Sequence, residues 1–337
     1  MGTYFLRRLL LMIPTLIGVS LLVFTITQLV PGGPIDNLVR QMKMGQSGSD
    51  ANSTIELTEE YRQALEALYG FDKPAYVQYL IWMKNVLSLD FGESYEYQEP
   101  VLDVILYRLP VSLSFGIWTF FAVYLLSIPL GVFKAIKENS TFDVMTSFLL
   151  FFAYSIPHFA LAILLIVFFG GGSFWEWFPI QGLHSDNADQ LPMLEYLLDY
   201  FHHLFLPLFC YMLGFFAVET FMMKNSFIAQ ISQDYTRTAR AKGLPEKMVY
   251  FKHVLKNALI PIATSIGSWV GLFLAGSILL EYIFGLEGIG LLNYESIQAR
   301  DYPVVLAIIM LSAMATLLGN FVSDVLYVIL DPRITYD

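Results

Sequence analysis

Residues 233–261 read QDYTRTARAKGLPEKMVYFKHVLKNALIP, a basic and largely polar segment that separates two apolar runs. Each of those runs, 200–223 and 257–280, is as long as the membrane-crossing part of a helix. The chain is therefore expected to leave the membrane after the first run, to place the basic segment in water, and to re-enter with the second.

The composition of the whole chain indicates a membrane protein, because 56% of its 337 residues are hydrophobic and only 14% are charged. A soluble core cannot bury that much apolar side chain. A helix needs about 20 apolar residues to cross a bilayer, and backbone polar groups in lipid must bond within their own segment. Six runs meet this requirement: 9–30, 109–133, 145–169, 200–223, 257–280 and 302–330. The sequence predicts an all-α polytopic protein with six transmembrane helices.

The distribution of Lys and Arg sets the orientation, because cytoplasmic loops hold an excess of both. With both termini in the cytoplasm, the cytoplasmic segments hold 12 bases and 8 acids, and the other side holds 7 bases and 21 acids. We therefore expect two cytoplasmic termini. The net charge of −10 then lies outside, which argues against nucleic acid as a partner and leaves membrane lipid around the spans.

Three parts follow from this topology: the N-terminus with the first span (1–30), an external cap (31–107), and a five-helix core (108–337) that contains the cytoplasmic segment 225–256. The cap has two stretches of helical periodicity, one between Thr58 and Gly70 and one that begins at Pro74. The second stretch has an apolar stripe through Val77, Leu80, Ile81 and Leu87. Residues 41–55, rich in Gly, Ser and Asn, are expected to be a mobile loop. A long loop without a role is the alternative to a small helical cap.

The basic segment is patterned as two short helices joined at Gly243, where a positive φ would end the first. The second helix opens at Leu244-Pro245-Glu246 and carries Lys247, Lys252 and Lys256 back to the membrane. The first helix has an inner and an outer side: Tyr235, Thr236 and Ala239 on the inner side, and Arg237, Arg240 and Lys242 on the outer side. The alternative is that these bases only satisfy the preference for positive charge in the cytoplasm.

This segment resembles the cytoplasmic motif shared by permease subunits of bacterial ABC importers. The motif reads Glu-Ala-Ala, three residues, Gly, nine residues and Ile-x-Leu-Pro, and its register falls on residues 237–239, Gly243 and 253–256. The Glu, one Ala, the Ile and the final Pro depart from it. The segment is more similar to the variant of the peptide and nickel branch, in which Thr-Ala-Arg-Ala-Lys-Gly (238–243) and Asn-Ala-Leu-x-Pro (257–261) are typical.

Further motifs of that branch are distributed along the chain, so the resemblance covers all of it. They are Arg7-Arg8 with Pro14-Thr15, Pro31-Gly-Gly-Pro34, YGFDKP (69–74), FGES (91–94), RLP (108–110), IPLG (128–131), KNSF (224–227), RDYP (300–303) and DPRI (331–334). Pro-Gly-Gly-Pro, where relatives usually have Pro-Gly-Asp-Pro, resembles the Yej-type importers of oligopeptides and microcin C.

The resemblance implies a type I ABC importer permease architecture in the bacterial inner membrane. The implied partners are a second homologous permease subunit, a cytoplasmic ABC ATPase with two nucleotide-binding domains and a periplasmic substrate-binding protein. The implied substrate is a peptide, with nickel or another small solute as the alternative. ATP and Mg²⁺ would bind the ATPase, because this chain has no G-x-x-x-x-G-K-[ST] loop, so it is expected to hold no cofactor and to be no enzyme itself. The residues expected to couple to the ATPase are Arg237, Thr238, Ala239, Arg240, Lys242, Gly243, Lys247 and Lys256.

Polar residues within the spans are candidates for a pore or gate. Glu219 lies near the cytoplasmic end of the fourth span, where pairing with a loop base is the alternative to a gating role. His158 follows Pro157, and a kink there would expose carbonyls to a water-filled path, with a packed histidine as the alternative. Asp324 shares a helix face with Asn320 and is expected to bond a neighbouring helix. No spacing of His, Cys or acids indicates a metal site or a catalytic site.

Two other classes of membrane protein stay open on the sequence alone. A secondary transporter would show paired broken spans in two halves of the chain and buried ion-coupling acids, and neither is evident. A membrane scaffold without transport activity would need no basic segment for uptake.

Overall fold

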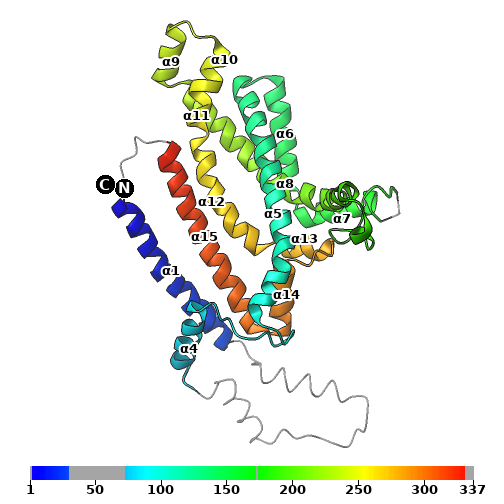
Figure 1. Cartoon of the computed structure of the whole chain (residues 1–337). Helices are drawn as coiled ribbons and strands as arrows, with labels where there is room; N and C mark the ends of the chain where they lie inside the picture. The colour runs from blue at the N-terminus through cyan, green and yellow to red at the C-terminus, as the bar shows by residue number, and fades with distance from the viewer. Residues whose placement is uncertain (1, 30–72, 172–173, 331–337) are drawn as a thin grey trace, which may run out of the picture.

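The computed structural model describes residues 2–29, 73–171 and 174–330, and these residues are mostly helical (Figure 1). The one β-bridge among them is isolated and pairs Glu93 with Pro100. The all-α prediction is confirmed. The long helices lie side by side, the short helices α9 and α10 project from one end of the molecule, and α4 lies at the opposite end (Figure 1).

Four of the described helices are long and apolar enough to cross a membrane by themselves. They are α1 (Gly2–Leu29), α5 (Val101–Ile136), α8 (Met193–Ile231) and α15 (Tyr302–Leu330). The 39 residues of α8 correspond to about 58 Å, almost twice the hydrocarbon thickness, so α8 extends well into water. Helix α5 starts at Val101, so the predicted boundary between cap and core at residue 108 falls inside a continuous helix.

The two remaining spans are bent pairs of helices, which brings the number of candidate spans among the described residues to six. Helices α6 (Thr141–Ser155) and α7 (His158–Phe169) meet at 94°. The kink predicted at Pro157 is thus a full break, because proline lacks an N–H and disfavours helical backbone at the residue before it. In Figure 1, α7 turns away sideways from the bundle.

The second bent pair joins the basic segment to the fifth span. Helix α10 (Glu246–Met248), a π-helical segment η2 (Val249–Val254) and α11 (Leu255–Ala258) lead into α12 (Ile260–Ala275) with a 43° bend. The span was predicted to reach residue 280, but α12 ends at Ala275 because Gly276 has φ +64°. The short helices α13 (Ile278–Ile283) and α14 (Ile289–Ala299) then lead to α15.

Close packing of α12 on α15 depends on two glycines. A side chain on Gly267 would overlap the carbonyl oxygen of Gly319, so the two backbones meet without a spacer. The hydroxyl of Ser323 accepts a hydrogen bond from the Gly267 N–H at 2.8 Å and donates one to the carbonyl of Thr264 at 2.7 Å. Small residues and side-chain hydroxyls are the usual means by which membrane helices associate.

Helix α4 (Ala75–Leu87) is the described part of the predicted cap, and the expected helix at 58–70 and loop at 41–55 lie outside the described residues. It packs on α1 through Tyr79 and Trp82, whose rings lie 5.5 and 6.1 Å from that of Phe24, and Tyr79 hydrogen-bonds Ser20 at 2.8 Å. The predicted stripe does not face α1. The face of α4 that packs on α1 is instead formed by large aromatic rings, one of which also makes a hydrogen bond. Leu80 and Ile81 lie away from this contact and are 62% and 42% exposed.

Candidate functional site

The basic segment forms a projection, residues 234–258, whose first helix is α9 (Asp234–Ala241). Thr236 is fully buried and donates a hydrogen bond to the carbonyl of Gln230 at 3.0 Å, and Ala239 is buried beside it. The prediction of an inner side is confirmed for these two residues. Tyr235 is more exposed and donates to the side chain of Gln230 at 2.8 Å. These contacts fix α9 against the end of α8.

Gly243 makes the corner between α9 and α10 with φ +76°, as predicted. Its N–H donates to the carbonyl of Arg240 at 2.9 Å, and the N–H of Leu244 donates to that of Ala239 at 3.4 Å. A Cβ atom placed on Gly243 would meet no atom within 4 Å. The requirement for glycine is therefore conformational, because L side chains disfavour this left-handed region.

Arg240 does not reach outward as predicted. Its guanidinium forms an ion pair with Glu246 at 2.8 Å and lies 5.9 Å from the centre of the Tyr250 ring. The Glu246 carboxylate raises the pKa of Arg240 further above its ordinary value. The correction has a geometric reason: the turn at Gly243 brings the start of α10 back beside α9, which places the Glu246 carboxylate within ion-pair distance of Arg240. This Arg240–Glu246 ion pair, here called the brace, holds α9 and α10 together at the corner.

The other predicted coupling residues take two kinds of position. Four of them are bases exposed to water: Arg237, Lys242, Lys247 and Lys256. Arg237, 72% exposed, forms an ion pair at 3.4 Å with Asp234, which is still more exposed. Thr238 is turned to its own helix and donates to the carbonyl of Asp234 at 2.9 Å. The exposed bases give the projection a positive surface.

The projection is anchored in the membrane core through its second half. Val249, Val254 and Ala258 are fully buried in one cluster with Met223 and Phe227 of α8. Ser226 of α8 donates to the carbonyl of Ala258 at 2.8 Å. The π-helical segment between these contacts was not predicted, and such segments are frequent at functional sites. A push on the projection would therefore act on α8 and α12 together.

Glu219 does not pair with a loop base. It is buried in α8, and one carboxylate oxygen accepts from the hydroxyl of Tyr124 in α5 at 3.4 Å. Tyr124 is also in hydrogen-bond contact with Ser265 of α12 at 2.7 Å and accepts from the indole of Trp269 at 3.0 Å. Lys224, the next base along α8, binds Asp143 at 2.7 Å. The cluster joins α5, α8 and α12 at one point inside the membrane.

His158 and Pro157 stand at the break between α6 and α7, both with exposed side chains. The ring of His158 lies against Gly214 of α8, where a Cβ atom would overlap its Nε2, and 6.5 Å from the ring of Tyr211. His158 therefore contacts α8 more than one helical turn before Glu219. Asp324 forms an ion pair with Arg8 of α1 at 2.7 Å, so the predicted bond to another helix is confirmed.

One buried charge cluster was not predicted from the sequence. Lys134 of α5 is fully buried, with its ammonium 3.0 Å from the carboxylate of Asp143, which also binds Lys224 of α8 at 2.7 Å. Asp143 lies in the first turn of α6, three residues after its N-cap Ser140. That Ser-x-x-Asp spacing is a recognised helix start and was the available signal. The cluster joins the three helices α5, α6 and α8.

Among the described residues, no group of three or more His, Cys, Asp or Glu side chains is placed to hold a metal ion.

A second buried acid that was not predicted from the sequence is Glu281 of α13. It accepts hydrogen bonds from the backbone N–H groups of Ser277 at 2.9 Å and Leu291 at 2.7 Å. The carboxylate thus ties the loop after α12 to α14, a structural role.

Comparison with known proteins adds to this geometry. Residues 127–336 match the family described as binding-protein-dependent transport system inner membrane component. The chain is 43% identical over 360 residues to the peptidoglycan transport system permease protein YejB of Agrobacterium fabrum. That alignment covers 100% of this chain and 99% of the relative. It is 40% identical over 362 residues to the inner membrane ABC transporter permease protein YejB of Escherichia coli O157:H7, with all of both chains covered. It is 36% identical over 337 residues to the oligopeptide transport system permease protein AppB of Bacillus subtilis, again over both full lengths.

The family match covers well over half of the chain and includes the basic projection, the buried charge cluster of Lys134, Asp143 and Lys224, and all spans after α5. ABC permeases of this family work with an ATPase and a binding protein. The chain belongs to the binding-protein-dependent inner membrane components and is a multi-pass permease subunit with the architecture of type I ABC importers.

Proposed function

We propose that this chain forms half of the translocation path of an ATP-driven importer of peptides, beside a second homologous permease subunit. A periplasmic binding protein delivers the substrate, and the ATPase partner binds ATP and Mg²⁺. The chain itself performs no catalysis. The observation that carries this proposal is the braced basic projection, which presents Arg237, Lys242 and Lys247 to water at the end of two membrane helices.

The position of the projection supports the orientation that we propose. The first turn of α1 and the last turn of α15 lie toward the end of the molecule that carries α9 and α10 (Figure 1). Helix α4 and helix α14 lie toward the opposite end (Figure 1). Because positive loops stay inside, we place both termini in the cytoplasm and α4 in the periplasm.

The coupling step uses two rigid connections. When nucleotide binding closes the ATPase, the movement reaches α9, and the Arg240–Glu246 ion pair keeps α9 and α10 at a fixed angle. Buried contacts of Val249, Val254 and Ala258 then pass the movement to α8 and α12. Nucleotide thereby favours one of two packings of the bundle, which is the general basis of ligand-driven switching.

Peptide is the substrate class that the relatives support, since their names refer to peptidoglycan and oligopeptide transport. Within the class, peptide antibiotics such as microcin C and fragments of peptidoglycan are candidates. Glu219, His158 and Pro157 are the proposed pore or gate residues. Few charges line the spans, and a path with few specific contacts releases varied cargo and leaves discrimination to the binding protein.

Two experiments test the proposal. The chain is extracted in mild detergent, and its partners are identified by mass spectrometry. An ATPase and a second permease are expected, whereas a chain that transports in liposomes without them would indicate a secondary transporter. The reconstituted complex is then assayed with labelled tripeptides and with Ni²⁺; uptake of the metal alone would replace peptide by a small solute.

Coupling is tested by exchanging the charges of the brace. Arg240→Glu and Glu246→Arg should each reduce ATPase stimulation by the loaded binding protein, and the double exchange should restore it, because the ion pair re-forms with reversed sign. Arg8→Asp with Asp324→Arg is the matched exchange at an ion pair outside the projection. If the single Arg240 and Glu246 variants couple normally, the brace has no role in coupling.

A further inference from the structure

Glu219 is a buried acid that has no positive partner among the described residues. It is 6% exposed, and its polar neighbours are the hydroxyls of Tyr124 and Ser265. One of its two carboxyl oxygens has no hydrogen-bond partner in the described part of the chain. An ionised carboxylate is costly to bury unless a counter-ion or several donors accompany it.

The three other acids that are buried among the described residues all have such company. The carboxylate of Asp143 binds two lysine ammonium groups, at 3.0 and 2.7 Å. Glu281 accepts from two backbone N–H groups at 2.9 and 2.7 Å, and Asp301 accepts from two at 3.1 and 3.3 Å. Each of these acids is thus surrounded by groups that stabilise a negative charge, whereas Glu219 has hydroxyls alone.

The hydrogens around Glu219 can be counted. Tyr124 and Ser265 each bring one hydroxyl hydrogen, and the Tyr124 oxygen also accepts from the indole N–H of Trp269 at 3.0 Å. Three contacts between oxygens each need a hydrogen: Ser265 with the carbonyl of Ile262 at 2.8 Å, Ser265 with Tyr124 at 2.7 Å, and Tyr124 with Glu219 at 3.4 Å. Two hydroxyls cannot supply three hydrogens.

We propose that Glu219 holds a proton in this packing of the bundle and donates it to the oxygen of Tyr124. Tyr124 then donates to Ser265, Ser265 donates to the carbonyl of Ile262, and each contact contains one hydrogen. An ionised Glu219 would need Ser265 to donate to Tyr124 and Tyr124 to Glu219, which leaves the 2.8 Å contact with Ile262 without a hydrogen. The unpartnered oxygen is then that of a neutral acid, which costs less to bury than that of an ion.

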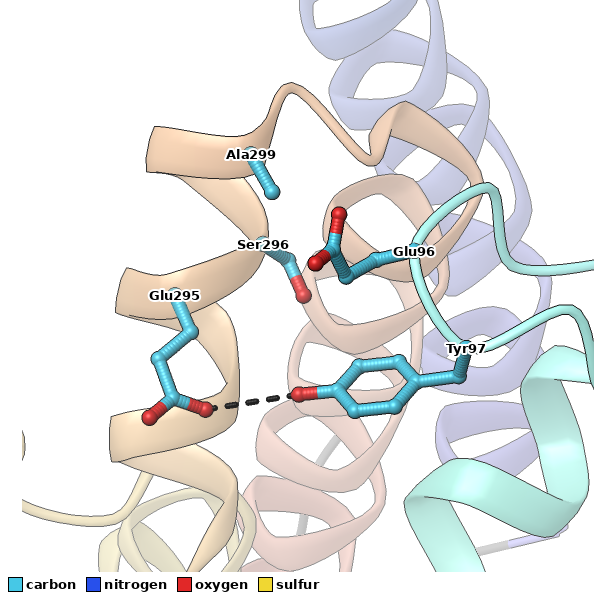
Figure 2. Close-up of a pocket in the computed structure, with 5 residues that line it drawn as sticks. All are labelled: Glu96, Tyr97, Glu295, Ser296 and Ala299. Carbon is cyan, nitrogen blue, oxygen red and sulfur yellow. Dashed lines mark hydrogen bonds between the residues drawn. The ribbon is translucent and has the colours of Figure 1, made fainter. Parts of the chain in front are cut away.

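A second tyrosine–glutamate pair provides a matched comparison (Figure 2). Tyr97 lies 3.4 Å from Glu295, the same distance as Tyr124 from Glu219. Glu295 is exposed, however, and the Tyr97 hydroxyl also contacts the Arg108 guanidinium, so water and a positive charge are both at hand. Glu295 is therefore expected to be ionised.

The proton makes the joint between α5, α8 and α12 uncharged. Helices that meet at an uncharged joint separate at the cost of its hydrogen bonds, whereas an ionised acid adds the larger cost of moving a charge within the membrane. This consequence rests on the proposed function, in which nucleotide favours one of two packings of the bundle. The proton itself does not depend on it.

Infrared difference spectroscopy of the full chain tests the protonation of Glu219 without any transport assay. The chain is measured at neutral pH in a maltoside detergent, which has no carbonyl group of its own. A neutral carboxylic acid has a carbonyl stretch above the amide I band, and an ionised one has two carboxylate stretches below it. Glu219→Gln should lose the acid carbonyl band, whereas Glu295→Gln, the matched control, should lose carboxylate stretches.

Loss of carboxylate stretches in Glu219→Gln would overturn the proposal, since replacing the acid must remove one pattern or the other. Glu219→Ala removes the same group and gives the same reading if the Gln variant does not insert. Tyr124→Phe removes the acceptor, so the Glu219 carbonyl band should move to higher frequency, and Tyr97→Phe should leave it in place. A band that does not move in Tyr124→Phe would overturn the bond to Tyr124. Because the spectra do not depend on transport, failure of the proposed function is distinguishable from failure of this inference.

Discussion

The hydroxyl of Ser94 donates a hydrogen bond to the carboxylate of Asp301, and both side chains are buried. The two residues are 207 positions apart, so this bond ties the loop after α4 to the turn between α14 and α15. They belong to the FGES and RDYP motifs quoted from the sequence. The structure thus gives two separate motifs one role, which is to hold together the face that we propose to be the outer one.

Asp301→Ala should destabilise this outer face. Three donors, the Ser94 hydroxyl and the N–H groups of Tyr95 and Glu96, would lose their acceptor, at roughly 1–3 kcal/mol for each group that stays buried. We expect a clear fall in the melting temperature of the detergent-solubilised chain. Ser94→Ala removes one donor and should cost less. A variant at Asp301 that melts like the parent would contradict the role of this carboxylate.

Gly243 should tolerate asparagine better than valine or proline. Its φ of +76° is acceptable for Asn, strained for a β-branched side chain and impossible for Pro. Because a Cβ atom at this position would meet no neighbour, alanine tests strain alone and should cost about 1 kcal/mol. The variants should insert and assemble, with ATPase stimulation by loaded binding protein falling in the order Asn, Ala, Val, Pro. A Gly243→Trp complex that transports at the parent rate would refute the coupling assignment.

Asp143→Ala should be among the most destabilising changes in the helix bundle. It would leave the fully buried ammonium of Lys134 without its counter-ion, and breaking a buried pair from one side costs about 3–5 kcal/mol. Lys224→Met removes the less buried of the two bases and should cost less. Thermal unfolding of both variants in nanodiscs checks this order. A melting temperature of Asp143→Ala equal to that of the parent chain would show that Asp143 contributes no more than a surface charge.

Leu80 and Ile81 on α4 should contribute to docking of the binding protein, since they are exposed apolar residues on the outer side. Replacing both by Asp should weaken docking to surface-immobilised complex while the ATPase stays bound. Replacing both by Asn separates the loss of apolar area from the added charge, because only the Asp variant should change the salt dependence. Normal binding by both variants at two salt concentrations would make α4 a passive lid.

Alanine at Glu219 or at His158 should lower peptide uptake only modestly. After Glu219→Ala, Tyr124 still has Ser265 and Trp269 as partners, so the cluster between α5, α8 and α12 keeps most of its bonds. His158→Ala leaves a small gap against Gly214. Uptake of cationic, neutral and anionic tripeptides provides the measurement. A selective loss of cationic peptides in Glu219→Ala would show that this carboxylate contacts the cargo.

The sequence alone determined the features that depend on neighbouring residues. Apolar runs of membrane length predicted the spans, Pro157 the break in the third, and Gly243 the corner of the projection. Each is a local effect of hydrophobicity or backbone sterics, so a short window contains the whole cause. The uneven distribution of bases likewise indicated the orientation that we propose, since charge needs only to be counted.

Tertiary structure decided which polar groups meet. Asp143 lies 81 positions from Lys224, Glu219 lies 95 from Tyr124 and Asp301 lies 207 from Ser94, so no sequence window contains both partners. Arg240 shows the same limit at short range, because the turn at Gly243 directs it to Glu246 rather than to water. Helix periodicity tells which residues share a face, but the packing of one helix on another selects the partner of each buried charge.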